Sequence, residues 1–149
     1  MTMTETSTPP TDPTTPAIRV LLVDDHRMLR ETLRHSMVDE GFDVVAEASD
    51  GHEAIHLART LRPDVALMDV TMPGLNGVDA AREVREVSPT TQVIMLTMHA
   101  DPRVITQALR AGAAGYLVKD CAIDEVAATV RDVVDPDQVL SSVVGSSIL

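Results

Sequence analysis

Five short apolar runs, separated by stretches with helical spacing, recur along this chain from residue 17 onward. They lie near 18–23, 43–47, 64–68, 92–97 and 114–118. Each run has the length and the continuous apolar character of a buried strand. A strand–helix alternation of this kind implies a parallel sheet with right-handed crossovers and helices on both faces. We therefore expect an α/β fold with a five-stranded parallel sheet in the flavodoxin-like order 2-1-3-4-5.

The stretches between the runs carry helix signals. Apolar positions repeat at helical spacing over 26–40, 51–61, 102–111 and about 122–134. Asp50 and Glu53 have the spacing of a capping box, and Asp101 places a cap residue before Pro102 in a first turn. The last of these helices is expected to end before Pro136.

Composition excludes several classes of function. With 149 residues, of which 44% are hydrophobic, the chain fits one compact domain plus tails. A formal net charge of -11 argues against an extended nucleic-acid surface, because phosphate contacts need clustered Lys and Arg. The single cysteine, Cys121, cannot form an internal disulfide. No signal segment and no apolar run of roughly 18 residues is present, so no membrane contact and a cytoplasmic location are expected.

Charged side chains follow three of the predicted strands. Asp24 and Asp25 come directly after the first run, Asp69 after the third and Lys119 after the fifth. In the order 2-1-3-4-5 the first and third strands are neighbours, and the carboxyl edge of such a sheet is where ligands bind. Gathered carboxylates repel one another unless a cation relieves them, and Mg²⁺ prefers oxygen ligands of this kind together with phosphate. The sequence therefore predicts a Mg²⁺ site at this edge.

Other metals fit the sequence less well. No twelve-residue calcium loop is present, and the five histidines are scattered without the thiolates or acidic partners of a soft-metal site. Thr97, at the end of the fourth run, and Lys119 have the hydroxyl and the point charge suited to a phosphoryl group. The simpler alternative is that Asp24 and Asp25 cap the first helix and Asp69 starts a turn.

Together these residues resemble the receiver domain of two-component response regulators. The resemblance covers residues 18 to about 134 and rests on the Asp24-Asp25 pair, Asp69 within 67–77, Thr97 at the end of 94–97 and Lys119 within 115–120. The run 111–120 is more particularly similar to the NarL/LuxR-type branch.

The resemblance implies a role for each matching position. Asp69 would be the phosphoacceptor, and Asp24, Asp25, Asp69 and the backbone carbonyl of Thr71 would hold Mg²⁺. Thr97 and Lys119 would stabilise the phosphoryl group. Thr97 and Tyr116 would form the switch that reports phosphorylation. A sensor histidine kinase would supply the phosphoryl group, and a homodimer is expected on activation.

The resemblance also organises the chain ends. Residues 1–16, mostly Thr, Pro and Ser, are expected to be a disordered leader, and 17–135 the receiver domain. Residues 136–149 are expected to begin a linker to an absent C-terminal helix-turn-helix domain, through which alone the protein would bind DNA. The expected function is thus that of a transcription regulator's phosphoacceptor domain. It is not expected to be an enzyme, beyond self-phosphorylation and slow self-dephosphorylation.

Two alternatives remain open. A stand-alone receiver that acts by docking on a partner protein would share every site residue. A Mg²⁺-dependent phosphohydrolase of the haloacid dehalogenase type also uses an Asp after a strand, but it typically needs a second Asp at the position of Thr71. A dinucleotide-binding enzyme is disfavoured because no glycine fingerprint follows the first run.

Overall fold

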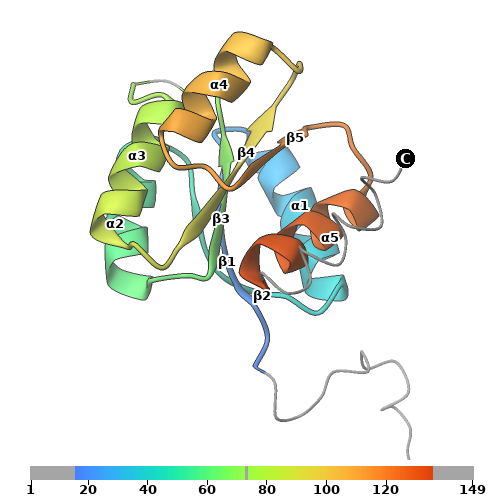
Figure 1. Ribbon diagram of the computed structural model, residues 1–149. Coiled ribbons are helices and arrows are strands. Elements are labelled where there is room, and N and C mark those ends of the chain that lie inside the picture. The colour runs from blue at the N-terminus through green and yellow to red at the C-terminus, as the bar shows by residue number, and fades with distance from the viewer. Residues whose placement is uncertain (1–15, 73, 136–149) are drawn as a thin grey trace, which may run out of the picture.

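The computed structural model describes residues 16–72 and 74–135 (Figure 1). Residues 1–15 of the expected leader and the whole expected linker start at 136–149 lie outside this part of the chain. Within the described ranges, no helix combines the length and the apolar character that crossing a bilayer requires.

Five parallel strands form one sheet in the order β2-β1-β3-β4-β5, as predicted. Their bounds are β1 Arg19–Val23, β2 Asp43–Ala48, β3 Val65–Asp69, β4 Gln92–Thr97 and β5 Gly115–Val118. Because β1 and β3 pair side by side, the residues that follow Val23 and those at the end of β3 meet at the carboxyl edge. The predicted adjacency of the first and third strands is confirmed.

Five helices connect and follow the strands. Their bounds are α1 Arg27–Asp39, α2 Gly51–Leu61, α3 Gly77–Val87, α4 Pro102–Arg110 and α5 Ile123–Val134. The predicted starts of α2 and α4 are confirmed, because Asp50 accepts the Glu53 N–H and Asp101 accepts the Arg103 N–H. Helix α3 follows from the strand–helix alternation alone. Its local signal is Asn76, whose side chain accepts the Asp79 N–H.

The sheet separates two different apolar layers. Helices α1 and α5 cover one face, and α2, α3 and α4 cover the other (Figure 1). The layer under α1 and α5 is filled by large side chains such as Met37, Phe42 and Leu67. The opposite layer is rich in alanine, with Ala48, Ala54, Ala58, Ala66, Ala80, Ala81, Ala108 and Ala113. Small side chains let α2 and α3 lie close to the sheet and to each other.

Two glycines mark the closest approaches in the alanine-rich layer. A Cβ at Gly51 would lie 3.1 Å from the Ala80 Cβ and 3.1 Å from the Leu75 carbonyl oxygen. A Cβ at Gly77, the first residue of α3, would overlap the carbonyl oxygen of Asp69. The start of α3 therefore rests directly on the backbone of the residue that ends β3, which requires glycine there.

Candidate functional site

The predicted site residues lie together at the carboxyl edge of the sheet. Asp24 and Asp25 follow β1, Asp69 ends β3, and Lys119 follows β5. Asp24 and Asp69 are 5% and 2% exposed, so both carboxylates are withdrawn from solvent. The sequence prediction that residues far apart in the chain converge here agrees with the described structure.

Lys119 joins two of the carboxylates. Its Nζ lies 3.0 Å from Asp24 Oδ2 and 3.0 Å from Asp69 Oδ2, and its side chain is 10% exposed. Burial alone would lower the pKa of Lys119, but hydrogen bonds to Asp24 and Asp69 outweigh it and raise that pKa. The amine therefore carries its charge throughout the neutral range and offsets part of the repulsion between the acids.

Asp69 is held through both of its oxygens. Oδ2 accepts from Lys119, and Oδ1 accepts the Thr71 backbone N–H at 3.1 Å. Burial raises the pKa of Asp69, and these two hydrogen bonds only partly oppose the rise. The nearby Asp24 carboxylate raises it further. The ionised form of Asp69 is thus less favourable than that of an exposed aspartate, because burial and the neighbouring Asp24 carboxylate both oppose it.

Asp24 also has the local role of the simpler alternative. Its Oδ1 accepts the His26 N–H at 2.9 Å, two residues along, as a turn-forming aspartate does. Asp69 likewise accepts from Thr71. Asp24 and Asp69 therefore make turn-forming contacts and also bind Lys119. The simpler alternative does not exclude the charged site.

His26 differs from the expectation that the histidines lie away from acidic partners. Its Nδ1 is 3.3 Å from Asp24 Oδ1 and 3.3 Å from Asp25 Oδ1. Asp24, Asp25, His26 and Asp69 each offer one donor atom, and these atoms all lie within 4.8 Å of one another. The sequence did contain the signal, since His26 directly follows the acidic pair. The other four histidines belong to no such group among the described residues.

Thr97 and Tyr116 lie on the two strands beyond β3, Thr97 at the carboxyl end of β4 and Tyr116 within β5, where it pairs with Met95. Thr97, at the end of β4, is 9% exposed, and its hydroxyl donates to the His99 carbonyl at 2.8 Å. Tyr116, on β5, is 42% exposed. The Thr97 hydroxyl is therefore engaged with its own loop, and the Tyr116 ring is partly in solvent.

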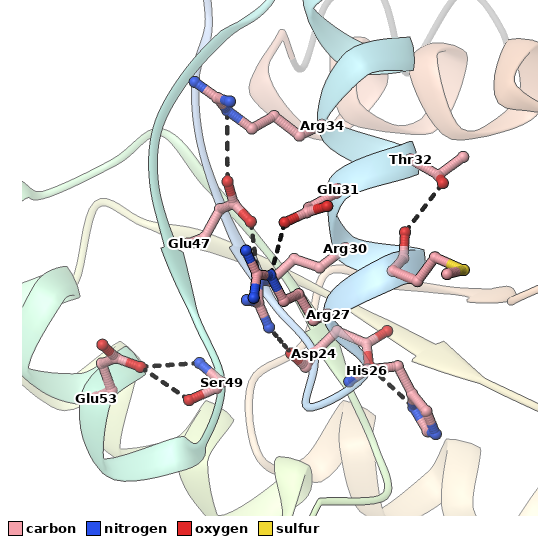
Figure 2. Close-up of polar contacts among 11 residues, drawn as sticks. Asp24, His26, Arg27, Arg30, Glu31, Thr32, Arg34, Glu47, Ser49 and Glu53 are labelled. Atoms are coloured by element: carbon pink, nitrogen blue, oxygen red, sulfur yellow. Dashed lines mark hydrogen bonds and ion pairs between the residues drawn. The ribbon is translucent and has the colours of Figure 1, made fainter.

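Arg30 was missed by sequence reasoning. From the first turn of α1 its Nη1 donates to the Asp24 carbonyl at 2.6 Å, and its Nε donates to Glu47 on β2 at 2.9 Å (Figure 2). No motif predicts this link, because Glu47 lies 17 residues away and on another element. The one feature of the local sequence that points to this contact is that Arg30 lies only six residues after Asp24.

The geometry agrees with comparisons to known proteins. A family model described as the response regulator receiver domain matches residues 20–131. The chain is 40% identical over 126 residues to the response regulator UvrY of Escherichia coli K12, covering 84% of this chain and 58% of UvrY. It is 38% identical over 115 residues to the transcriptional regulatory protein DegU of Brevibacillus brevis, covering 76% of this chain and 49% of DegU.

A solved structure extends the likeness to the fold. The signal receiver domain of the putative response regulator NarL from Mycobacterium tuberculosis is 37% identical and superposes with a TM-score of 0.76. The match covers 80% of this chain and 98% of that domain. By contrast, the chain spans only 58% of UvrY and 49% of DegU, which are longer proteins.

Proposed function

The chain belongs to the response regulator receiver family of two-component systems, in its NarL/LuxR-type branch, and on this premise we propose that Asp69 is its phosphoacceptor. The observation that carries the proposal is the position of Lys119 Nζ, 3.0 Å from Asp69 Oδ2. A buried carboxylate beside a buried amine gives a nucleophilic oxygen next to a charge that can neutralise an incoming phosphoryl group.

The donor atoms fit Mg²⁺ as the companion cation. Asp24, Asp25 and Asp69 present carboxylate oxygens within 4.8 Å of one another, which suits a hard divalent ion that retains several waters. We propose the Thr71 backbone carbonyl as a further ligand, following the family resemblance. When bound, Mg²⁺ neutralises charge on the phosphoryl oxygens.

The chain's own residues then perform the transfer. One oxygen of Asp69 attacks the phosphorus of a phosphohistidine in line, the new O–P bond forms, and the N–P electron pair stays on the leaving imidazole. Lys119 exchanges its hydrogen bond to Asp69 for one to a phosphoryl oxygen. Catalysis is mainly positioning and electrostatic stabilisation, as in other phosphoryl transfers.

Thr97 and Tyr116 would respond to the phosphorylation of Asp69. The acyl phosphate adds a charge of about -1.5 to -2 and fresh acceptor oxygens. The Thr97 hydroxyl, which donates to His99 O in this state, would turn to a phosphoryl oxygen. Its departure would leave space into which the half-exposed Tyr116 ring can move. Phosphorylation would in this way bias the region between Thr97 and Tyr116 toward a second arrangement.

Mass spectrometry tests the phosphoacceptor directly. Incubation with acetyl phosphate and Mg²⁺ should add one phosphoryl group to the native protein and none to Asp69→Asn. The exposed Asp39 at the end of α1 supplies a matched control, because Asp39→Asn removes the same charge far from the sheet edge. An undiminished mass gain in Asp69→Asn would refute the assignment.

Several partners follow from this function. We propose a sensor histidine kinase as the donor, and a groove that runs from Asp24 and Lys119 past Leu29, Cys121 and Ile123 supports docking beside the site. Homodimerisation on activation is proposed through the α4–β5–α5 face, where Leu109 and Tyr116 are exposed. Sedimentation with and without beryllofluoride should show a shift toward dimer.

The output is proposed from the longer relatives. We propose that the domain belongs to a cytoplasmic transcription regulator that binds DNA through a separate C-terminal domain. DegU, one of the longer relatives, is a transcriptional regulatory protein. A stand-alone receiver would share this site, and the length of the gene distinguishes the two. A phosphohydrolase is disfavoured, because the matched family is a signalling family and Thr71 stands where a second Asp is needed. Single labelling without steady turnover is expected.

A further inference from the structure

We propose that Arg30 is a positioning residue for the metal site, acting through the backbone of the acidic pair. It holds the carbonyl of Asp24 and thereby sets the direction of the Asp25 side chain. The inference rests on the metal site proposed above. It is carried by the contacts of four residues at and beside the β1–α1 turn, namely Asp24, Asp25, Arg30 and Glu47. Figure 2 draws all of them except Asp25.

The first step concerns how firmly Asp24 is held. Its backbone N–H donates to the Ala48 carbonyl at 3.0 Å, and its two carboxylate oxygens are engaged by His26 and Lys119. The carbonyl oxygen of Asp24 is its remaining polar atom. That oxygen accepts from Arg30 Nη1 at 2.6 Å. Arg30 therefore completes the fixation of Asp24.

The second step concerns Asp25, which has much less support. Across residues 16–72 and 74–135, the only recorded polar contact of its side chain is the His26 ring at 3.3 Å, and that ring is itself 64% exposed. The Asp24 carbonyl and the Asp25 nitrogen belong to one planar peptide unit. Fixing the carbonyl oxygen therefore fixes the plane that holds the Asp25 nitrogen and Cα, from which the Asp25 side chain departs.

The third step is that Arg30 is itself fixed. Its Nε donates to Glu47 Oε1 at 2.9 Å, and the two side chains are 14% and 25% exposed. Arg34, one turn farther along α1, lies 3.4 Å from the other Glu47 oxygen. Arg30 thus ties the β1–α1 turn to β2 as well as to its own helix (Figure 2).

The fourth step is that the start of α1 lacks the usual alternative. At α2, α3 and α4 the cap side chains Asp50, Asn76 and Asp101 accept a backbone N–H of the first turn. At α1 the cap position is His26, which makes no such side-chain bond. A side-chain cap normally holds the entry to a helix. Arg30 supplies a comparable restraint from within α1.

The direction in which Mg²⁺ affinity changes when the Arg30 charge is removed distinguishes a positioning role from simple electrostatics. A guanidinium next to the acidic pair repels a divalent cation, so its removal should strengthen cation binding if Coulomb forces alone matter. The positioning role predicts the opposite result. Loss of a residue that orients metal ligands typically weakens metal binding tenfold or more.

Calorimetric titration of Mg²⁺ into the whole chain tests this difference. Arg30→Gln should bind Mg²⁺ about tenfold more weakly than the native protein. Arg34→Gln is the matched control, because it removes the same charge from the same helix and the same Glu47 but makes no contact with the turn. Its Mg²⁺ affinity should equal or slightly exceed the native value.

Arg30→Lys keeps the test valid if Arg30→Gln does not fold. It retains the charge, but an ammonium cannot reproduce the planar, two-pronged contact with Asp24 and Glu47, so Mg²⁺ binding should still be several-fold weaker. Urea unfolding in the presence of EDTA measures the fold separately. A folded Arg30→Lys protein with reduced affinity supports the positioning role.

The outcomes that overturn the inference are distinct from failure of the metal site. Native or tighter Mg²⁺ affinity in both Arg30 variants refutes the positioning role and leaves the site intact. An equal loss in Arg34→Gln also refutes it, because Arg34 does not touch the turn. If the native protein itself fails to bind Mg²⁺, the proposed metal site falls and the inference falls with it.

Discussion

At the amino edge of the sheet, buried polar side chains bind neighbouring backbone, whereas at the carboxyl edge the carboxylates of Asp24 and Asp69 converge on the Lys119 amine. Thr91 and Ser88 are 0% exposed, and the Thr91 hydroxyl donates to the Pro63 carbonyl at 2.7 Å and lies 2.6 Å from the Ser88 hydroxyl. At the other edge, burial raises the pKa of Asp69 despite its contact with Lys119. The polar groups of the amino edge therefore stabilise the fold, whereas the buried charge of Asp69 at the carboxyl edge destabilises it.

The largest expected effect is on the carboxyl edge, at Lys119. Lys119→Gln removes the charge beside Asp69, and loss of one such stabilising group typically slows transfer by about 10²–10³-fold. The rate of phosphoryl labelling at saturating acetyl phosphate measures it. Arg19→Gln is the matching change at the amino edge, where the guanidinium binds the carbonyls of Leu61 and Arg62. Its labelling rate should stay native, and an equal slowing there would contradict the contrast.

A second prediction concerns Gly77, which packs directly against the backbone of Asp69. Gly77→Ala forces a Cβ against the Asp69 carbonyl oxygen, and overpacking of this kind costs roughly 1–3 kcal/mol of unfolding free energy. It should also weaken Mg²⁺ binding, because the backbone of a ligand is displaced. Gly115→Ala is the control, since its added Cβ meets its nearest atom, in Thr129, at 3.8 Å. Urea unfolding should show a lower unfolding free energy, and calorimetry a weaker Mg²⁺ affinity, for Gly77→Ala but not for Gly115→Ala.

A third prediction tests the amino edge. Thr91→Val leaves the buried Pro63 carbonyl and Ser88 hydroxyl without their partner, which should lower the unfolding free energy by about 1–2 kcal/mol. Mg²⁺ affinity should not change. A shift in Mg²⁺ affinity with Thr91→Val would mean that the two edges are coupled and not independent.

The smallest predicted effect has the opposite sign. Asp69→Asn replaces a buried charge by a neutral amide of similar shape, so the Mg²⁺-free protein should become more stable at pH 7 by about 0.5–2 kcal/mol. Removing Thr91 lowers stability and removing the Asp69 charge raises it. A destabilised Asp69→Asn protein would show that the contact with Lys119 outweighs the burial.

The pH dependence of that gain follows from the sign of the shift. Because the folded pKa of Asp69 is raised, the penalty of ionising it is absent below its ordinary value of 3.8 and grows as pH rises through the folded pKa. The stability difference between Asp69→Asn and the native protein should therefore increase with pH over that window. Urea unfolding at several pH values, without Mg²⁺, measures it.

The sequence predicted those features that depend on local pattern and on strand order. The alternation of runs and helices gave the 2-1-3-4-5 sheet, and strand-end positions identified Asp24, Asp69 and Lys119. What it missed depends on side chains meeting across elements. The reach of Arg30 to Glu47 and the contact of Gly77 with Asp69 depend on packing distances that periodicity does not encode. The contact of His26 with the acidic pair is different. It could have been predicted from the sequence, because His26 directly follows Asp24 and Asp25.

The alanine-rich layer under α2 and α3 also bears on how this chain can diverge over generations. An added methyl group there would push a helix outward, and α3 begins at the glycine that touches Asp69. The face under α1 and α5, filled by residues such as Met37 and Leu67, can exchange one bulky side chain for another of similar volume. Among homologous chains, the buried residues beneath α1 and α5 should therefore vary readily. Those beneath α2 and α3 should vary little.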